Sequence, residues 1–193
     1  GKLIDALWGY ECLGYYNSQE EIDNAEAKSS FGTVKPGDLK YKDQNGDGVI
    51  DSKDRVVIGR WSAKFTGGMN LTLKYKNFTL FAMLTGQFGG NAIKNDTYNW
   101  VYGERKYSDV VLGAWTENKY KNGESITYPR LTTQSGDNNF NTSDYWMYST
   151  DRIDLSRVQL TYDFSKSLFG DNALVKGLQV YVNELCILIV SCS

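Results

Sequence analysis

Residues 43–54 combine oxygen-bearing side chains with glycine at a spacing that can hold a metal ion. With Asp43 as position 1, side-chain oxygens stand at positions 1, 3, 5, 9 and 12, glycine at position 6 and an apolar residue at position 8. Ca²⁺ prefers six to eight oxygen ligands, and EF-hand loops supply them at this spacing, with a backbone carbonyl at position 7. The expected calcium ligands are Asp43, Asn45, Asp47, Val49 through its carbonyl, Asp51 directly or through water, and Asp54.

A solvated acidic turn is the alternative interpretation of this stretch. Carboxylates crowded together repel each other by about 4 kcal/mol per close pair at an effective dielectric near 20. A solvated turn also has no need of both Gly48 and Ile50. Because residues 38–42 alternate polar and apolar side chains, we expect an extended segment before the loop, and Asp51 can cap one short turn within it. We therefore expect the metal to stabilise a surface loop. We do not expect it to act as a sensor that opens a pair of helices.

Composition favours an all-β protein and excludes several functions. The 193 residues can form one domain, and aromatics at 14%, 19 glycines and two prolines are typical of strands and turns. A net charge of −2 without a basic stretch argues against nucleic acid as a partner, and the absence of histidine removes the commonest general base. Three irregularly spaced cysteines predict neither a disulfide framework nor a zinc site. The chain begins with Gly1 and is expected to be part of a longer chain.

Residues 64–88 alternate in a way that predicts a long β-hairpin with a turn at Lys76-Asn77. One face is apolar or small throughout, with aromatic residues at both ends. The expected pairs are Tyr75 with Phe78, Leu73 with Leu80, Leu71 with Ala82, Met69 with Leu84, Gly67 with Gly86 and Phe65 with Phe88. An apolar band between aromatic girdles is what a membrane barrel presents to lipid, and a soluble β-sandwich is the alternative.

Further elements are expected on both sides of this hairpin. Residues 9–16 and 150–164 are predicted strands, and a change of phase near Ser156-Arg157 predicts a bulge in the second. A long irregular loop should run from 89 to 144, a connection should occupy 165–176, and another strand should begin at 177–183.

Several runs of residues resemble, in order and spacing, the SusC/RagA family of TonB-dependent outer-membrane receptors. The most specific run is 37–51, GDLKYKDQNGDGVID, which is followed by DRVVIG at 54–59. The supporting runs are GYYNSQEEI at 14–22, FTGGMNL at 65–71, YPRL at 128–131, DLSRVQLTY at 154–162 and LQVYV at 178–182. The resemblance covers about residues 9–183.

This resemblance implies antiparallel strands from the late part of a 22-stranded transmembrane β-barrel with long extracellular loops. Together with the composition and the spacing of residues 43–54, it predicts an all-β fold that carries an EF-hand-like calcium loop. Residues 1–183 would be a partial barrel containing the calcium loop 43–54, the hairpin 64–88, the extracellular loop 89–144 and strands over 150–183. Residues 184–193 depart from the family pattern and are expected to form an atypical tail, closer to a shifted reading frame or truncation than to a strand.

The resemblance also implies a location and partners. The expected location is the outer membrane of a Gram-negative bacterium, in contact with its lipid. The expected activity is uptake of oligosaccharides or peptides, energised by TonB through an N-terminal region absent from this chain. A SusD-like surface lipoprotein is the expected partner.

Other functions are weaker interpretations of the same residues. The acidic residues of the long loop (Asp109, Glu117, Glu124, Asp137 and Asp144) could be imagined as paired catalytic carboxylates, but nothing fixes their separation, so we expect no enzyme. Trp100, Trp115 and Tyr98 are candidate surfaces for stacking on a substrate. A secreted, calcium-stabilised adhesion or dockerin-like module is the alternative function.

Overall fold

The structure is a computed structural model that describes residues 4–103, 106–133, 138–164 and 178–191, with the backbone alone described for 185–191. The chain divides into two compact units. The first comprises Gly1–Trp61 and Asn91–Tyr148, and the second comprises Ser62–Gly90 and Ser149–Ser193. The connection expected at 165–176 lies outside the described residues.

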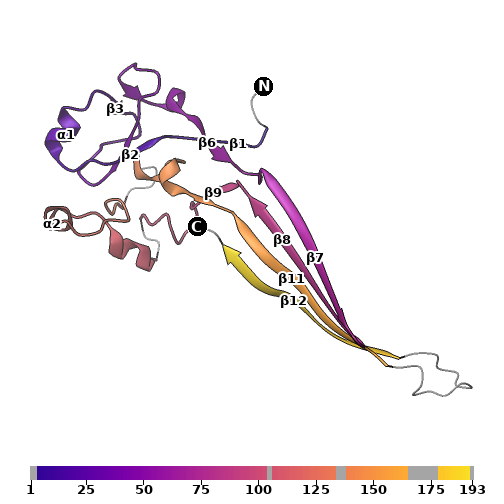
Figure 1. Cartoon of the computed structure of the whole chain (residues 1–193). Coiled ribbons are helices and arrows are strands. Elements are labelled where there is room, and N and C mark those ends of the chain that lie inside the picture. Colours follow the sequence, from indigo (N-terminus) through magenta and orange to yellow (C-terminus); the bar gives the residue numbers. More distant parts are fainter. Residues whose placement is uncertain (1–3, 104–105, 134–137, 165–177, 192–193) are drawn as a thin grey trace, which may run out of the picture. The chain divides into compact units, whose positions relative to one another are not determined.

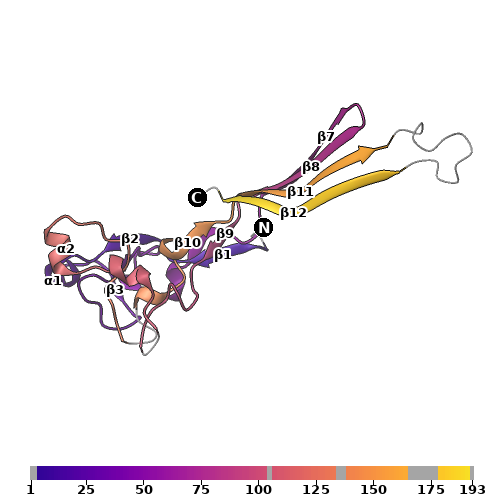
Figure 2. The ribbon, with the colours of Figure 1, turned by 90° about the horizontal axis from the view of Figure 1, so that it is seen from below.

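The second unit contains a sheet of four long antiparallel strands (Figures 1 and 2). These are β7 (Phe65–Tyr75), β8 (Phe78–Phe88), β11 (Arg152–Asp163) and β12 (Gln179–Ser191), in the order β12-β11-β8-β7. The predicted hairpin is confirmed in every pair, from Tyr75 opposite Phe78 to Phe65 opposite Phe88. Lys76 in the turn adopts a positive φ of 52°. The two-residue turn and the period-2 pattern therefore fix the register as the sequence predicts.

The predicted bulge in β11 is also confirmed. The register shifts between Leu155 and Arg157 in the pairings of β11 with both β8 and β12. Ser156 is the extra residue, and its Oγ lies 2.8 Å from Oγ1 of Thr85 on β8. Because of the bulge, Leu155 opposite Leu84 and Leu160 opposite Leu80 both join the apolar face of the hairpin.

The end of the chain differs from the expected atypical tail. The backbone of β12 continues through Glu184 to Ser191, which pairs with Arg152. Residues 185–190 are apolar and include two isoleucines and a valine, which favour strands, and β11 pairs with Leu185 and again with Leu188 to Ser191, on either side of its bulge. The final residues, 192 and 193, lie outside the described part of the chain.

The first unit is built from short elements. Its strand pairs are β1 (Ala6–Gly9) with β6 (Val56–Arg60), β2 (Cys12–Tyr15) with β4 (Leu39–Tyr41), β3 (Lys28–Ser29) with β5 (Val49–Ile50), and β9 (Asn91–Ile93) with β10 (Met147–Ser149). The helices are α1 (Gln19–Asp23) and α2 (Glu117–Lys121), with 3₁₀ turns η1 (Ser52–Asp54), η2 (Asp109–Gly113), η3 (Asn138–Phe140) and η4 (Asp144–Trp146). The single strand expected over 9–16 is instead divided between β1 and β2, because the two pieces pair with different strands. No helix of the described residues is long and apolar enough to cross a membrane.

The core of this unit is contributed by both of its chain segments. Buried residues from the first segment are Leu7, Tyr10, Leu39, Tyr41 and Ile50, and those from the second include Ile93, Ala114, Tyr128, Phe140 and Trp146. The stretch 89–144 has little regular structure in its described residues, as predicted, but Trp100, Tyr102, Tyr128 and Phe140 from it pack in this core. Long irregular segments can be ordered by their own side chains, and this one is ordered by packing with residues 7–50.

Candidate metal loop and its supports

The loop 43–54 is held by the regular elements around it. β4 leads directly into the loop, β5 lies within it, and η1 closes it. Asp51 caps η1, and its side chain and that of Asp54 form a reciprocal capping box. Gly48 adopts a φ of +81°, which a residue with a side chain rarely tolerates. The extended entry and the single turn capped by Asp51 are therefore confirmed.

The first carboxylates of the loop are bound by its backbone. Asp43 Oδ1 accepts from the N–H groups of Asn45 (3.2 Å) and Gly46 (2.6 Å), and Oδ2 accepts from that of Gly48 (2.9 Å). Asp47 Oδ1 accepts from the N–H of Val49 at 3.0 Å. These bonds, led by those from Gly48 and Val49, lower the pKa of Asp43 and of Asp47 below the usual value. Both groups are therefore held as carboxylates, the form that binds a cation.

The last expected ligand joins the two ends of the loop. Asp54 is fully buried, and its Oδ1 accepts from the N–H of Gln44 at 2.9 Å, while its Oδ2 accepts from the N–H of Asp51 at 2.8 Å. Asp51 Oδ1 accepts from the N–H of Lys53 at 2.7 Å. The Lys53 ammonium lies 3.4 Å from Asp47 Oδ2 and 3.5 Å from Asp51 Oδ2. A side-chain cation thus already contacts two of the expected ligands.

The donor set fits a hard cation such as Ca²⁺. All six expected ligand atoms are oxygens, and they follow one another in the order that the EF-hand pattern requires. Within the described ranges, no three His, Cys, Asp or Glu side chains converge closely enough to hold a metal ion as they stand. Since the loop carboxylates point to backbone N–H groups and to Lys53, metal binding would require some of their oxygens to turn inward.

A buried polar network joins the strand before the loop to residues 130–139. Asp38 is fully buried and accepts from Arg130 Nε at 2.9 Å and from Asn139 Nδ2 at 2.8 Å. Asn139 Oδ1 accepts from the N–H of Leu39 at 2.8 Å, and Asn138 Nδ2 donates to the Leu39 carbonyl at 2.6 Å. The two asparagines therefore act like a neighbouring strand for the start of β4. Sequence reasoning missed this network, because its members lie about a hundred residues apart.

The loop strand β5 is tied to the same network. β5 pairs in parallel with β3, so that Val49 lies opposite Lys28 and Ile50 opposite Ser29. Ser29 Oγ then donates to Asn138 Oδ1 at 2.7 Å. The loop is thus fixed at its entry through β4 and at its middle through β5.

The candidate stacking residues are not gathered on one surface. Trp115 is buried, with its ring centroid 6.4 Å from that of Tyr120. Trp100 packs against Phe140 and Trp146 in the core. Tyr98 is 51% exposed, and its hydroxyl bonds to the Asp109 carboxylate. The two tryptophans therefore act mainly in packing, and of the three only Tyr98 exposes its ring.

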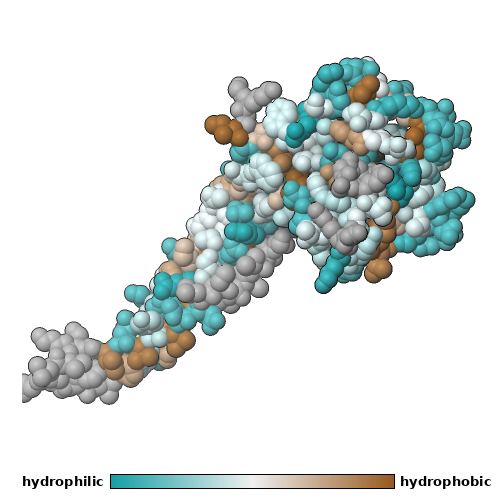
Figure 3. Space-filling model, turned by 180° about the vertical axis from the view of Figure 1, so that it is seen from behind, coloured by the Kyte–Doolittle hydropathy of each residue, from teal (hydrophilic) through white to brown (hydrophobic). Residues whose placement is uncertain are grey.

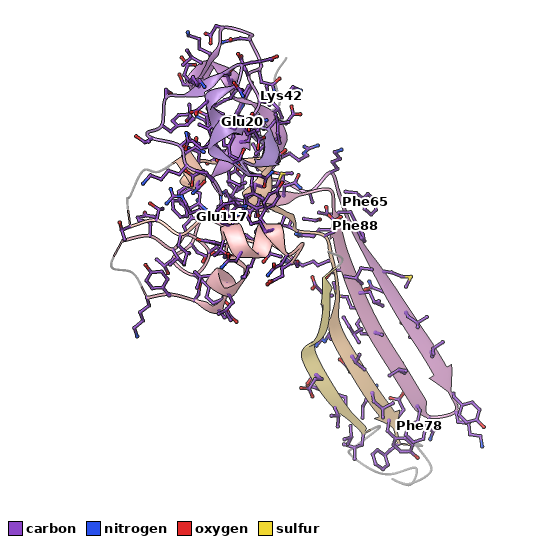
Figure 4. The ribbon with its side chains drawn as sticks, turned by 90° about the vertical axis from the view of Figure 1, so that its left-hand side faces the viewer. Glu20, Lys42, Phe65, Phe78, Phe88 and Glu117 are labelled. Atoms are coloured by element: carbon purple, nitrogen blue, oxygen red, sulfur yellow. The ribbon has the colours of Figure 1, made fainter. Side chains whose placement is uncertain are left out.

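The sheet of the second unit exposes the apolar face predicted for it. Met69, Leu71 and Leu73 on β7 are 60%, 44% and 53% exposed, and hydrophobic side chains lie at the surface near one end of the sheet (Figure 3). Phe65 and Phe88 lie together at one end of the hairpin and Phe78 at the other (Figure 4). The Phe65 and Phe88 rings are 6.4 Å apart. Contiguous apolar surface of this kind marks a protein or membrane contact.

Comparison with known proteins identifies relatives along most of the chain. No protein-family model matches it. TonB-dependent receptor P39 of Formosa agariphila is 30% identical over 154 residues, which cover 76% of this chain and 14% of that receptor. Receptor P26 of the same organism is 29% identical over 195 residues, covering 99% of this chain and 19% of the receptor. SusC of Bacteroides thetaiotaomicron is 23% identical over 156 residues, or 81% of this chain and 14% of SusC.

The solved structures agree with these relatives. The RagAB peptide importer in its open-open state superposes with a TM-score of 0.68 at 21% identity, covering 97% of this chain and 19% of that one. The closed-closed state of the same importer superposes with a TM-score of 0.67. The chain is a SusC/RagA-like receptor fragment. It spans 14–20% of the length of the relatives and solved structures named here.

The SusC/RagA-like relationship agrees with the all-β architecture of the two units. It also fits the expectation that the chain is not an enzyme, because the named relatives are receptors and an importer.

Proposed function

We propose that this chain forms part of the wall of an outer-membrane nutrient importer in a Gram-negative bacterium. The observation that carries the proposal is the sheet of the second unit, whose strands are 11 to 13 residues long and whose apolar face is exposed. At about 3.3 Å per residue and a tilt near 40°, such strands rise roughly 30 Å, enough to cross a hydrocarbon core.

The edges of the sheet support a larger, closed assembly. Within the described residues, β7 and β12 each pair along one side only. Strands in lipid must satisfy every backbone group, and only a closed barrel does so. The remaining strands of a 22-stranded barrel would pair with these two edges, and residues 89–144 would then lie in the extracellular region.

The names of the relatives support a proposal for the transported ligand and the partners. SusC-like and RagA-like proteins are named as TonB-dependent receptors and as a peptide importer. We therefore propose TonB-energised uptake of an oligosaccharide or peptide, with a SusD-like lipoprotein at the extracellular side. The TonB contact would belong to a part of the receptor outside this chain.

We also propose that loop 43–54 binds Ca²⁺ as a structural ion. The support is the ordered set of oxygen donors, two ionised aspartates and a frame fixed through β4 and β5. When bound, the ion supplies positive charge among the loop carboxylates. It would fix the entry to β6 and the contact of β5 with β3.

Charge placed on the two faces of the sheet tests the membrane proposal. Leu73→Arg on the apolar face should cost about 2–4 kcal/mol in lipid, whereas Thr72→Arg on the opposite face should be tolerated. The measurement is the amount of folded, heat-modifiable receptor in outer membranes when each change is made in a full-length receptor that carries this segment. Equal assembly of the two variants would contradict the proposal.

Calorimetry tests the calcium proposal. Asp47→Ala removes one ligand and should weaken Ca²⁺ binding by at least tenfold, while Asp23→Ala, a matched change at the end of α1, should leave it unchanged. Both are measured in the 193-residue chain in detergent. A wild-type chain that is folded and binds no Ca²⁺ would refute this proposal and leave the membrane proposal standing.

The alternative function, a secreted calcium-stabilised adhesion or dockerin-like module, is favoured by one observation. The first unit has its own buried core and contains the whole loop. A secreted module should be monodisperse in plain buffer, whereas the exposed sheet should make the chain depend on detergent. Analytical ultracentrifugation with and without detergent distinguishes the two.

A further inference from the structure

We propose that Lys53 is an internal counter-cation of loop 43–54, which holds the loop together without metal and keeps its affinity for Ca²⁺ low. This inference rests on the proposed calcium site. It assigns to a residue that is not a ligand the role of setting the affinity of the site.

The position of Lys53 carries the inference. Its ammonium lies 3.4 Å from Asp47 Oδ2 and 3.5 Å from Asp51 Oδ2, at positions 5 and 9 of the loop. Its backbone N–H donates to the other oxygen of Asp51 at 2.7 Å. The side chain is 67% exposed, so its flexible stem can move the charge into solvent. The lysine is therefore bound to two ligands and free to leave them.

The charges of the loop explain why this residue is needed. Asp43, Asp47, Asp51 and Asp54 lie within twelve residues, and without a cation their repulsion opposes the closed loop. One ammonium between Asp47 and Asp51 relieves part of that repulsion. Asn45 Nδ2 also donates to Asp47 Oδ2 at 3.1 Å, so this oxygen accepts from both Asn45 and Lys53.

The same contacts weaken metal binding. Ca²⁺ must displace the ammonium from Asp47 and Asp51 before it gains those oxygens, and the displaced lysine then remains near a divalent ion of like charge. Without the lysine, the repulsion between the loop carboxylates is not reduced before Ca²⁺ binds. Binding of Ca²⁺ therefore relieves more repulsion in the variant than in wild type. The loss of two exposed ion pairs corresponds to roughly a three- to tenfold gain in Ca²⁺ affinity.

Calorimetry on the 193-residue chain in detergent tests the role of Lys53. Lys53→Met should bind Ca²⁺ about three- to tenfold more tightly than wild type, and Lys53→Arg, which retains the charge, should stay within twofold of it. Lys42→Met is the matched control, since Lys42 (Figure 4) precedes the loop directly but pairs with Glu11 Oε2 at 3.1 Å. This control removes the same charge and should change the dissociation constant less than twofold.

Hydrogen exchange supplies a second readout that a merely structural lysine would not produce. Without metal, the amides of Gly48 and Val49 should exchange faster in Lys53→Met than in wild type, and at saturating Ca²⁺ the two chains should exchange equally. If Lys53→Met binds Ca²⁺ with unchanged or weaker affinity, the role of Lys53 is refuted and the calcium site stands. If wild type and all variants fail to bind, the calcium proposal itself is refuted and this inference with it.

Discussion

Replacing Asn139 by alanine should destabilise the first unit strongly. Its side chain is fully buried and holds both the N–H of Leu39, at 2.8 Å, and the carboxylate of Asp38, also at 2.8 Å. Alanine leaves a buried N–H without its acceptor, at about 1–3 kcal/mol, and removes a hydrogen bond to a charged group, worth about 1.5–3 kcal/mol. Because the two losses share one site, we expect a total of about 3–5 kcal/mol.

The control is Asn141→Ala, which removes a similar side chain that makes one bond, to the Asn138 carbonyl at 3.0 Å. It should cost about 1 kcal/mol or less. Urea unfolding followed by near-ultraviolet circular dichroism reports on the aromatic core around Trp146, whose Nε1 donates to the Asn139 carbonyl at 2.8 Å. Exchange at the Leu39 amide should accelerate in the Asn139 variant alone. Equal costs for the two variants would refute the claim that the asparagines hold β4.

Three further changes test other parts of the fold. Gly37→Ala should cost about 3 kcal/mol, because the glycine has a φ of +91° and a Cβ would lie 2.6 Å from Cδ2 of the Trp115 ring. Gly32→Ala, at a φ of +126° with open space around it, should cost only the backbone strain, as urea unfolding would show. Lys76→Gly should stabilise the β7–β8 turn by about 1 kcal/mol, measured by amide exchange in the hairpin, because Lys76 has a φ of 52°. Burial raises the pKa of the Asp38 carboxyl above its ordinary value of 3.8, so the stability that this group contributes is complete below pH 3.8 and is lost as the pH rises through the folded-state pKa. The difference in unfolding free energy between wild type and Asp38→Asn, measured by urea titration, should therefore decrease as the pH rises from 3.8.

Each of these expectations has a result that would contradict it. Equal destabilisation by Gly37→Ala and Gly32→Ala would mean that the Trp115 ring moves aside freely. Lys74→Gly, a change within β7, is the control for Lys76→Gly. If it also slowed amide exchange in the hairpin, glycine would not be acting through the turn. If the difference in unfolding free energy between wild type and Asp38→Asn instead increased with pH, the ion pair of Asp38 with Arg130 would outweigh the effect of burial on the pKa of Asp38.

Local patterns explain why the hairpin, the bulge, the extended segment before loop 43–54 and the turn capped by Asp51 could be predicted from the sequence. A two-residue turn and alternating side chains specify the pairing of β7 with β8, and a change of phase marks Ser156. Each of these signals lies within a few residues of the feature it determines. The spacing of residues 43–54 is equally local, and the calcium ion that it predicts remains a proposal.

Features that depend on contacts distant in sequence could not be predicted in this way. Nothing near Asn139 indicates that it binds Leu39, and nothing near Trp115 indicates that it packs beneath Gly37. The same is true of β12, whose backbone continues to Ser191 because β11 supplies partners for it. Trp100 and Trp115 looked available for a ligand, but Trp115 is buried and Trp100 packs against the core.

The most direct test of the central claim is a spin-label scan along β7 in a full-length receptor reconstituted in lipid bilayers. Nitroxides placed one at a time at residues 69–73 should alternate with a period of two. Met69, Leu71 and Leu73 should be more accessible to oxygen, which concentrates in lipid, and Asn70 and Thr72 to a water-soluble nickel chelate. Uniform accessibility along the strand, or alternation in the opposite phase, would contradict the assignment of this sheet to a lipid-facing wall.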